Sequence, residues 1–256
     1  MRILNRASVA FFIVNDYSKG AISNARIMCN NSYIPYSNKG DGYYSFLNLE
    51  NGMYKFDIMC DGFKPVSYEV KVSDIQPIQI VSCLKYSSDS TDLYNINKIV
   101  FYIKNDEKTL ENTDIKIKLD TKVLFLKLID PIEKNSNVIN INSDFDKRLL
   151  YQDYTYDKRQ AMVINLNGYD HINKAYQNSK VYKSKVVEGG YLIPLWNFTT
   201  DAFGRVILPI NPVFFAKPQA DLTLTILKKK YSVRINTNDT ENIEIDISKG
   251  EIKGGI

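Results

Sequence analysis

The stretch Asn38–Pro65, NKGDGYYSFLNLENGMYKFDIMCDGFKP, decides the fold of the first part of the chain. It separates runs of aromatic and aliphatic residues by three short turns, which contain the pairs Asp41-Gly42, Asn51-Gly52 and Asp61-Gly62. Glycine adopts positive φ without a steric cost, and Asp or Asn side chains cap the neighbouring backbone. We therefore interpret the three pairs as turns and not as parts of a catalytic loop.

Side chains alternate between these turns, as in a strand with one buried face. Tyr54, Phe56 and Ile58 alternate with Met53, Lys55 and Asp57, which is a period of two residues. The candidate core residues of the stretch are Tyr44, Phe46, Leu47, Tyr54, Phe56 and Ile58. Five or more short strands in about 80 residues predict a β-sandwich.

Composition and charge limit the classes of partner. The 256 residues suffice for one large domain or two of ordinary size, and the net charge is only +4. Binding to nucleic acid or to a membrane surface requires clustered charge, so we expect neither partner. The basic run Lys228–Lys230 lies between two strand-like runs and predicts a solvated hairpin tip, with a phosphate-binding patch as the alternative.

Three cysteines and the first residues bear on the compartment. Cys29, Cys60 and Cys83 form no CxxC pair, which favours a reducing compartment. Cys29 and Cys60 each follow a Met in a strand-like run, so we expect both to be small buried side chains. The apolar run VAFFIV is too short for a signal sequence and predicts a first strand instead. No run reaches the roughly 18 apolar residues of a membrane span. We expect synthesis in the cytoplasm without a signal peptide.

The chain contains an internal similarity after a polar break. YSSDSTD, residues 86–92, predicts a linker. NDYSKGAISNARIM from Asn15 is then similar to NDEKTLENTDIKI from Asn105, and an apolar strand precedes both. The similarity indicates a repeat of the first hairpin of the sandwich, with chance as the alternative. TDAFGRVILPI, residues 200–210, supplies a second version of the opening stretch.

These patterns predict an all-β chain with two Ig-like or transthyretin-like sandwiches in tandem. The first occupies residues 1–86, a linker residues 87–95, and the second residues 96–256. The second sandwich carries a mainly β insertion at about 120–197, as a small barrel or a set of hairpins, because a structureless loop of that length is rare. GYDHINKAYQN, residues 168–178, is its least regular part and could hold one helical turn.

Catalytic motifs are lacking. The single histidine, His171, has no nearby Ser or Cys in a nucleophile motif, and no phosphate-binding glycine loop or zinc-type cluster occurs. The carboxylate pairs Asp144/Asp146 and Asp153/Asp157 offer too few oxygens for calcium. We expect no enzyme activity, cofactor or metal, with a dispersed active site as the alternative.

Aromatic residues are the richest resource for binding, with 18 Tyr, 12 Phe and one Trp. Tyrosine is enriched at protein interfaces and also stacks on sugars, although strands favour tyrosine in any case. Our candidate interface residues, all within the predicted insertion, are Tyr151, Tyr154, Tyr156, Tyr169, Tyr176, Tyr182 and Trp196.

Residues about 8–74 resemble the carboxypeptidase regulatory-like domain, a transthyretin-like sandwich. The resemblance rests on GAISNARIMC, KGDGYYSFLNLENGMYKFDI and DGFKP. It implies an appended structural module and says little about function. A related group, the pilin and adhesin domains with an internal Lys–Asn isopeptide bond, carries a Glu six residues after the glycine turn. Ile58 stands at that distance from Gly52, so we expect no isopeptide bond in the first sandwich.

Tandem sandwiches of this type without a signal peptide look like components of bacteriophages or phage-tail-like contractile particles. This analogy, together with the tyrosines, predicts a non-enzymatic structural or adaptor protein. Its partners would be other protein subunits, with a homo-oligomer as one option, and sandwich edges would pair with partner strands. The alternative is a carbohydrate-binding or adhesion module that recognises a cell-surface glycan.

Overall fold

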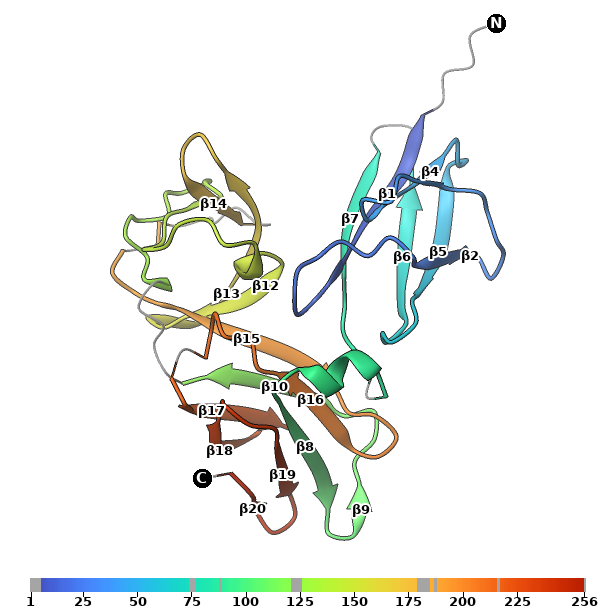
Figure 1. The fold of residues 1–256 in the computed structure, drawn as a ribbon. Helices are drawn as coiled ribbons and strands as arrows, with labels where there is room; N and C mark the ends of the chain where they lie inside the picture. Colours follow the sequence, from blue (N-terminus) through green and yellow to red (C-terminus); the bar gives the residue numbers. More distant parts are fainter. Residues whose placement is uncertain are drawn as a thin grey trace, which may run out of the picture. The chain divides into compact units, whose positions relative to one another are not determined.

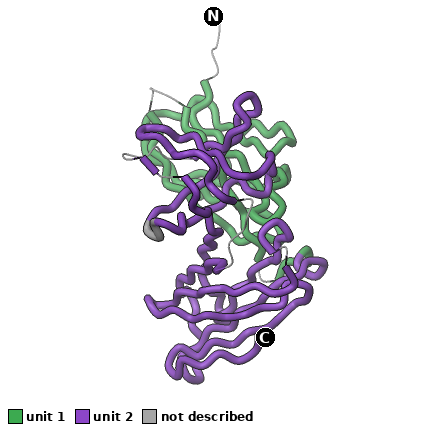
Figure 2. Tube along the Cα trace, turned by 90° about the vertical axis from the view of Figure 1, so that its left-hand side faces the viewer, with its two compact units in different colours: residues 1–92 green, residues 93–256 purple. Residues whose placement is uncertain are grey.

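The computed structural model describes residues 6–73, 77–87, 89–120, 126–178, 185–186, 188–215 and 217–255, and for 159–161 only the backbone. The contacts divide the chain into unit 1, residues 1–92, and unit 2, residues 93–256 (Figure 2). From the sequence we expect the first sandwich to end at residue 86 and the second to begin at residue 96, and these exact boundaries remain predictions.

Unit 1 is a sandwich of two sheets (Figure 1). One sheet has the order β3-β4-β1-β7, and the other has the order β2-β5-β6. The strands are β1 Ala7–Asn15, β2 Arg26–Cys29, β3 Ser37–Asn38, β4 Tyr43–Leu47, β5 Gly52–Met59, β6 Val66–Val72 and β7 Ile78–Leu84. All pairs are antiparallel except β1 with β7, which is parallel.

The opening stretch forms β4, β5 and the turns around them. Gly42 and Gly62 adopt positive φ of 85° and 80°, as their turns require. Between β4 and β5, however, Asn48 takes the left-handed conformation, at φ 55°, and Gly52 begins the strand. Of the six candidate core residues, four are fully buried, which are Tyr44, Phe46, Phe56 and Ile58.

The other two candidate core residues occupy different positions. Leu47 is 39% exposed because it follows Phe46 on the strand and therefore points to the opposite face. Tyr54 is half-buried and packs on the margin of the core.

Unit 2 contains an eight-stranded sheet of order β11-β14-β13-β12-β15-β10-β17-β18. A second sheet has the order β16-β8-β19-β20, and β9 pairs with β8. The strands are β8 Lys98–Asn105, β9 Lys108–Thr109, β10 Asp114–Leu119, β11 Val138–Ile139, β12 Gln152–Tyr156, β13 Arg159–Asp170, β14 Ala175–Asn178, β15 Leu192–Thr199, β16 Arg205–Pro209, β17 Gln219–Ile226, β18 Lys229–Asn236, β19 Glu241–Asp246 and β20 Glu251–Lys253. Among the described residues, 3-10 helices occur at η1 Thr91–Asn95, within the predicted linker, and at η3 Lys147–Leu149 in unit 2.

The two sandwiches share one pairing pattern. β1 pairs antiparallel with β4 and parallel with β7, and β8 pairs in the same two ways with β16 and β19. The sheet β2-β5-β6 corresponds to the run β10-β17-β18. The chain is thus all β, with two sandwiches of the same topology, and the second is interrupted between β10 and β16.

Individual hydrogen bonds repeat as well. The Ile13 amide donates to the Gly42 carbonyl at 2.9 Å, and the Ile103 amide donates to the Gly204 carbonyl at 2.8 Å. The Ile22 amide donates to the Ile13 carbonyl at 2.9 Å, as the Leu110 amide does to the Ile103 carbonyl at 3.0 Å. These bonds confirm the predicted repeat and show that residues 200–210 correspond to the opening stretch.

The insertion extends the larger sheet of the second sandwich, and within it β12 with β13 and β13 with β14 form antiparallel hairpins. β15 pairs with β12 on one side and with β10 on the other, so one sheet runs through both parts. A single core of buried side chains also includes both parts. The predicted helical turn in residues 168–178 is wrong, because β13 and β14 form a hairpin there with a turn at residues 171–174.

The basic run Lys228–Lys230 lies at the tip of the β17–β18 hairpin, as predicted. β17 and β18 pair along their whole length, and the turn between them lies at Leu227 and Lys228. Lys229 and Lys230 begin β18 with exposed side chains.

Candidate protein-contact site

Three aromatic rings gather at the tip of the β13–β14 hairpin. The ring centroids of Phe145 and Tyr169 lie 4.7 Å apart, and His171 lies 5.0 Å from each, edge-on to both. Phe145 is 42% exposed and the neighbouring Ile172 is 92% exposed. We call Phe145, Tyr169, His171 and Ile172 the hairpin-tip patch.

A buried tyrosine, Tyr176, packs against the patch and binds the segment that carries Phe145. Tyr176 on β14 lies opposite Tyr169 on β13, with ring centroids 4.8 Å apart. Its hydroxyl accepts a hydrogen bond from the Asp146 amide and donates one to the Asp144 carbonyl, both at 2.9 Å. The residues on either side of Phe145 are therefore tied to the hairpin, which fixes the position of that ring.

The turn that carries His171 and Ile172 is closed by an aspartate. The Asp170 carboxylate accepts hydrogen bonds from the backbone amides of Ile172 and Asn173 and from the Asn173 side chain. The Asn173 side-chain bond is the main cause that lowers the pKa of Asp170. The charged carboxylate thus holds the turn in one conformation at neutral pH.

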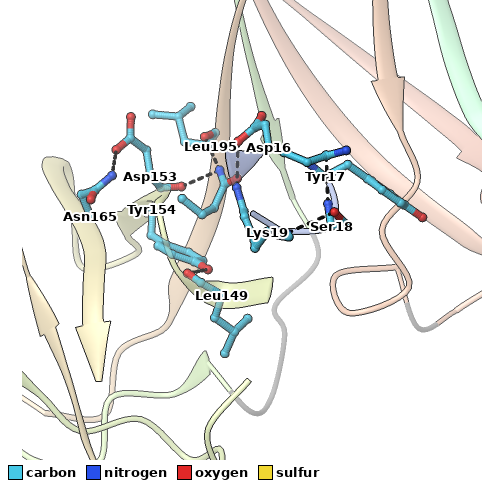
Figure 3. A network of polar contacts seen from close by, with 12 residues as sticks. Asp16, Tyr17, Ser18, Lys19, Leu149, Asp153, Tyr154, Asn165 and Leu195 are labelled. Atoms are coloured by element: carbon cyan, nitrogen blue, oxygen red, sulfur yellow. Dashed lines mark hydrogen bonds and ion pairs between the residues drawn. The ribbon is translucent and has the colours of Figure 1, made fainter. Parts of the chain in front are cut away.

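The carboxylate pairs named from the sequence do not converge on a metal. Asp146 forms an ion pair with Arg148 at 2.6 Å and caps η3, and Asp153 accepts a hydrogen bond from Asn165 (Figure 3). Asp157 accepts a hydrogen bond from the Tyr191 amide. In the parts of the chain that the structure describes, no group of three or more His, Cys, Asp or Glu could hold a metal ion.

Four of the seven candidate interface residues lie in the core of unit 2. Tyr154 and Tyr156 are fully buried, Tyr176 is 1% exposed and Trp196 is 9% exposed. Tyr154 and Trp196 pack against Phe214 in the loop before β17. The Tyr156 ring lies against Gly190, and the Tyr176 ring packs against Tyr169. As buried side chains, these four cannot be the exposed contact residues that we expected.

Tyr154 shows how closely these residues are built into the core. Its hydroxyl donates to the Leu149 carbonyl at 2.9 Å (Figure 3). Burial raises the pKa of Tyr154 well above its usual value. The hydroxyl is therefore neutral and serves to connect β12 with η3.

The remaining three candidate interface residues have different positions in the structure. Tyr169 belongs to the patch, and Tyr151 is half-buried and packs against the core. Tyr182 lies outside the described residues. Sequence reasoning missed Phe145 and Ile172 and treated His171 as a lone residue. The visible signal was a large apolar side chain among polar neighbours, in SDFDK and GYDHINK.

A second feature is a shallow pocket of about 400 Å³ at the end of the β17–β18 hairpin. It is lined by Lys217, Pro218, Gln219, Ala220, Asp221 and Arg234. Arg234 and Asp221, which both line it, form an ion pair at 2.7 Å, so these two charges compensate each other.

Among the described residues, no helix has the length and apolarity to cross a membrane.

Comparisons with known proteins give no family. No protein-family description and no curated protein sequence matches the chain. Among solved structures, the Bacillus anthracis TIE protein aligns at 10% identity and TM-score 0.29 over 98% of this chain and 34% of its own. The chain thus spans about a third of the length of that protein.

Two pilin subunits align over nearly their whole length. The major pilin subunit of Bacillus cereus shows 10% identity, TM-score 0.28 and coverage of 98% of this chain and 100% of its own. The shaft pilin SpaA of Lactobacillus rhamnosus GG shows 11% identity, TM-score 0.24 and coverage of 95% and 97%. TM-scores this low do not establish a shared fold, so the fold assignment rests on the strands and their pairing in this chain.

Proposed function

We propose that the chain is a non-enzymatic structural or adaptor protein that binds another protein subunit through the hairpin-tip patch. The observation that carries this proposal is the patch itself, an exposed group of aromatic rings with an aliphatic side chain beside it. Aromatic side chains in fixed positions are typical anchors of protein interfaces.

The energetics favour a protein partner. Full burial of an isoleucine side chain contributes about 1.5–3 kcal/mol, and Ile172 is almost completely exposed without a partner. Little conformational entropy remains to be lost on binding, because Tyr176 and Asp170 already hold the segments on which the patch lies. Charged side chains at Asp144 and Lys174 flank the patch and would supply the polar rim of an interface.

Site-specific cross-linking tests the proposal. We expect a photoreactive phenylalanine analogue at position 172 to cross-link the partner in a lysate of the native source. Leu227 provides the control position, because it is also an exposed aliphatic residue, 60% exposed, at a hairpin tip of unit 2. A discrete adduct at position 172 and none at position 227 supports the proposal. Adducts at both positions or at neither would contradict it.

Affinity measurements with the partner so identified give a second readout. We expect Phe145→Ala and Ile172→Asp each to weaken binding at least about tenfold, which corresponds to about 1.4 kcal/mol. Leu227→Asp should leave binding unchanged. The fluorescence of Trp196 in the core of unit 2 verifies that each variant is folded. Equal affinities for all three variants would refute a role of the patch.

The carbohydrate alternative has lost part of its support. It required insertion tyrosines and Trp196 on one exposed face, and four of these rings are buried. Phe145 and Tyr169 remain as rings on which a sugar could stack. A glycan array distinguishes the two functions, since binding that Phe145→Ala abolishes would favour the carbohydrate.

The finer part of the proposal concerns the assembly. We propose a phage or phage-tail-like contractile particle, with the chain made in the cytoplasm and then incorporated. The support is the resemblance of the tandem sandwiches to components of such particles. Mass spectrometry of purified native particles tests this part, and absence of the chain from them would overturn it without affecting the proposed role of the patch.

A further inference from the structure

The outer face of the larger sheet in unit 2 carries a row of lysines. β10, β17 and β18 are neighbours in this sheet (Figure 1). Lys116 of β10 lies opposite Thr225 of β17, and Thr225 lies opposite Lys230 of β18. Residues directly opposite each other on neighbouring strands share a face. Lys116, Thr225 and Lys230 therefore form one row across three strands.

Burial shows that this row faces away from the core. Ile115 and Ile117, which flank Lys116 on β10, are almost fully buried, whereas Lys116 is exposed. Tyr231 follows Lys230 on β18 and is buried, whereas Lys230 is exposed. Because successive residues of a strand point to opposite faces, the lysine side chains project from the outer face.

A third lysine extends the row into a cluster. Lys118 lies two residues after Lys116, so it shares the same face at a distance of about 7 Å along the strand. Lys230 lies two strand spacings from Lys116, which is about 10 Å. The flexible four-carbon stem of lysine allows the ammonium groups to approach a common ligand across such distances. We call Lys116, Lys118 and Lys230 the lysine cluster.

The acidic residues at the two ends of β10 have partners of their own. Asp114 begins the strand and accepts a hydrogen bond from a threonine hydroxyl of β15. Asp120 follows the strand and forms an ion pair with Lys118 at 3.3 Å. Among the described residues, no carboxylate forms an ion pair with Lys116 or Lys230. The row thus carries two positive charges that the chain leaves uncompensated.

A second row beside the first adds hydroxyl groups to the face. Lys118 lies opposite Thr223 of β17, and Thr223 lies opposite Ser232 of β18. Ser232 is exposed. Beyond this row, Asp221 and Arg234 lie opposite each other and form an ion pair. Hydroxyl side chains therefore lie between and beside the lysines, where they can exchange hydrogen bonds with the hydroxyl groups of a sugar.

We propose that the lysine cluster binds an anionic polysaccharide. Carboxylate or sulfate groups of the sugar chain pair with the ammonium groups, and sugar hydroxyls form hydrogen bonds with Thr225 and Ser232. Charge complementarity selects this partner, because an anionic group between Lys116 and Lys230 replaces their mutual repulsion by attraction. The basic run Lys228–Lys230 thus contributes its last residue to a binding surface.

Nucleic acids and neutral sugars fit this face less well. The outward residues of β10, β17 and β18 include no aromatic side chain. Nucleobases and neutral sugars are held largely by stacking on aromatic rings, so the face lacks their main contact. Nucleic-acid binding also requires an extended positive surface, whereas the ion pairs of Asp120 and Asp221 limit the positive region to the cluster.

The inference goes beyond the proposed function, because it concerns another surface and another class of partner. Ile172→Asp in the hairpin-tip patch should leave polysaccharide binding unchanged. Loss of the lysine cluster should in turn leave binding of the protein partner at the patch unchanged.

Isothermal titration calorimetry of the full chain with dextran sulfate tests the proposal. At an ionic strength of about 0.01 M the Debye length is about 30 Å, so the attraction is hardly screened. We expect dextran sulfate to bind and neutral dextran, which has the same sugar backbone, not to bind. Binding should weaken steeply as the ionic strength rises to about 0.15 M, where the Debye length is about 8 Å.

Paired lysine variants locate the site. K116Q/K230Q should weaken binding at least about tenfold, which corresponds to about 1.4 kcal/mol. K108Q/K134Q is the matched control, because it removes the same charge from two exposed lysines, on β9 and in the loop before β11. This control should weaken binding less than about twofold. K116R/K230R keeps both charges and should bind as the wild type does.

Three results of the calorimetry would overturn the proposal. They are absence of dextran sulfate binding, equal binding of neutral dextran, and equal losses in the two glutamine double variants. Equally tight binding of single-stranded oligothymidylate that is lost in K116Q/K230Q would also overturn it, in favour of a nucleic-acid site. The fluorescence of Trp196 verifies that each variant is folded.

Discussion

Replacing Gly204 by alanine tests the packing of the second sandwich at its repeated turn. Gly204 has φ 68° and precedes β16. A Cβ atom there would lie 2.6 Å from the Ile103 carbonyl oxygen and 3.2 Å from the Leu110 amide nitrogen. Both are backbone atoms of β8 and the hairpin after it, so neither can rotate away.

The expected loss of stability has three parts. The left-handed conformation costs alanine about 1–2 kcal/mol. A shift of the backbone weakens the hydrogen bond from Ile103 to Gly204, which contributes about 1 kcal/mol. Overpacking adds about 1 kcal/mol or more. Gly204→Ala should therefore lower the free energy of unfolding of unit 2 by about 3 kcal/mol or more.

Gly250 provides the matched control in the same unit. It has nearly the same φ, 69°, but a Cβ atom added there would meet no atom within 4 Å beyond its chain neighbours. Gly250→Ala should therefore cost only the conformational part, about 1–2 kcal/mol. The difference between the two variants isolates the close approach to Ile103.

Urea unfolding followed by fluorescence measures the effect. Trp196 is the only tryptophan and lies in the core of unit 2, so its signal reports that unit. With an m value of about 2 kcal/mol/M, the midpoint should fall by about 1.5 M for Gly204→Ala. For Gly250→Ala it should fall by only about 0.5–1 M. Equal shifts would refute the packing argument.

Three further predictions concern other parts of the chain. Gly42→Ala should destabilise unit 1, because a Cβ atom would lie 3.0 Å from the Ile13 carbonyl oxygen. Circular dichroism should then show that unit 1 unfolds at a lower urea concentration, while the midpoint of the Trp196 fluorescence transition of unit 2 stays unchanged. Tyr154→Phe leaves a buried carbonyl without its donor and should lower the Trp196 midpoint by an amount equal to about 1–2 kcal/mol. The hydrogen bond from the Ser248 hydroxyl is the main cause that lowers the pKa of Asp246 to about 2. The charged Asp246 therefore stabilises the fold at a pH above its ordinary pKa of 3.8, and this contribution is lost as the pH falls from 3.8 toward 2. The Trp196 midpoint of Asp246→Asn should therefore change less between pH 5 and pH 2 than that of the wild type, and equal changes would contradict this.

Strands and their repeat were predictable because their signals are local. The alternation around Phe56 and the glycine turns reflect the two-residue period of a strand and the steric freedom of glycine. TDAFGRVILPI was predicted as the second copy of the opening stretch because a turn with Asp201 and Gly204 leads into an apolar strand. In the structure, Gly42 and Gly204 occupy equivalent turns. Asn48 was missed because several residue types can adopt positive φ in a turn.

Exposure of the tyrosines was not predictable from composition. Tyr154 and Tyr156 lie on β12, an inner strand between β13 and β15, and their rings are covered by Phe214 and Gly190. That arrangement depends on pairing between segments about 40 residues apart in the sequence, and no local pattern encodes it. Trp196 is covered by Phe214 and Phe215, which come from a loop after the next strand.

The hairpin-tip patch was missed for a similar reason. Phe145 meets Tyr169 and His171 only because Tyr176 binds the backbone on both sides of Phe145. The sequence showed each residue separately. The apolar residues Phe145 and Ile172 within polar loops were the visible signal, and exposure in a loop is more informative about binding than the number of tyrosines.

Hydroxyl-radical footprinting of the chain, alone and in its isolated native assembly, tests the central claim most directly. We predict that labelling of Phe145 and Ile172 falls severalfold in the assembly. Phe203, which is 65% exposed in the same unit, should be labelled equally in both states. Unchanged labelling of Phe145 and Ile172, with protection confined to other residues, would contradict the proposal that the hairpin-tip patch is the protein-contact site.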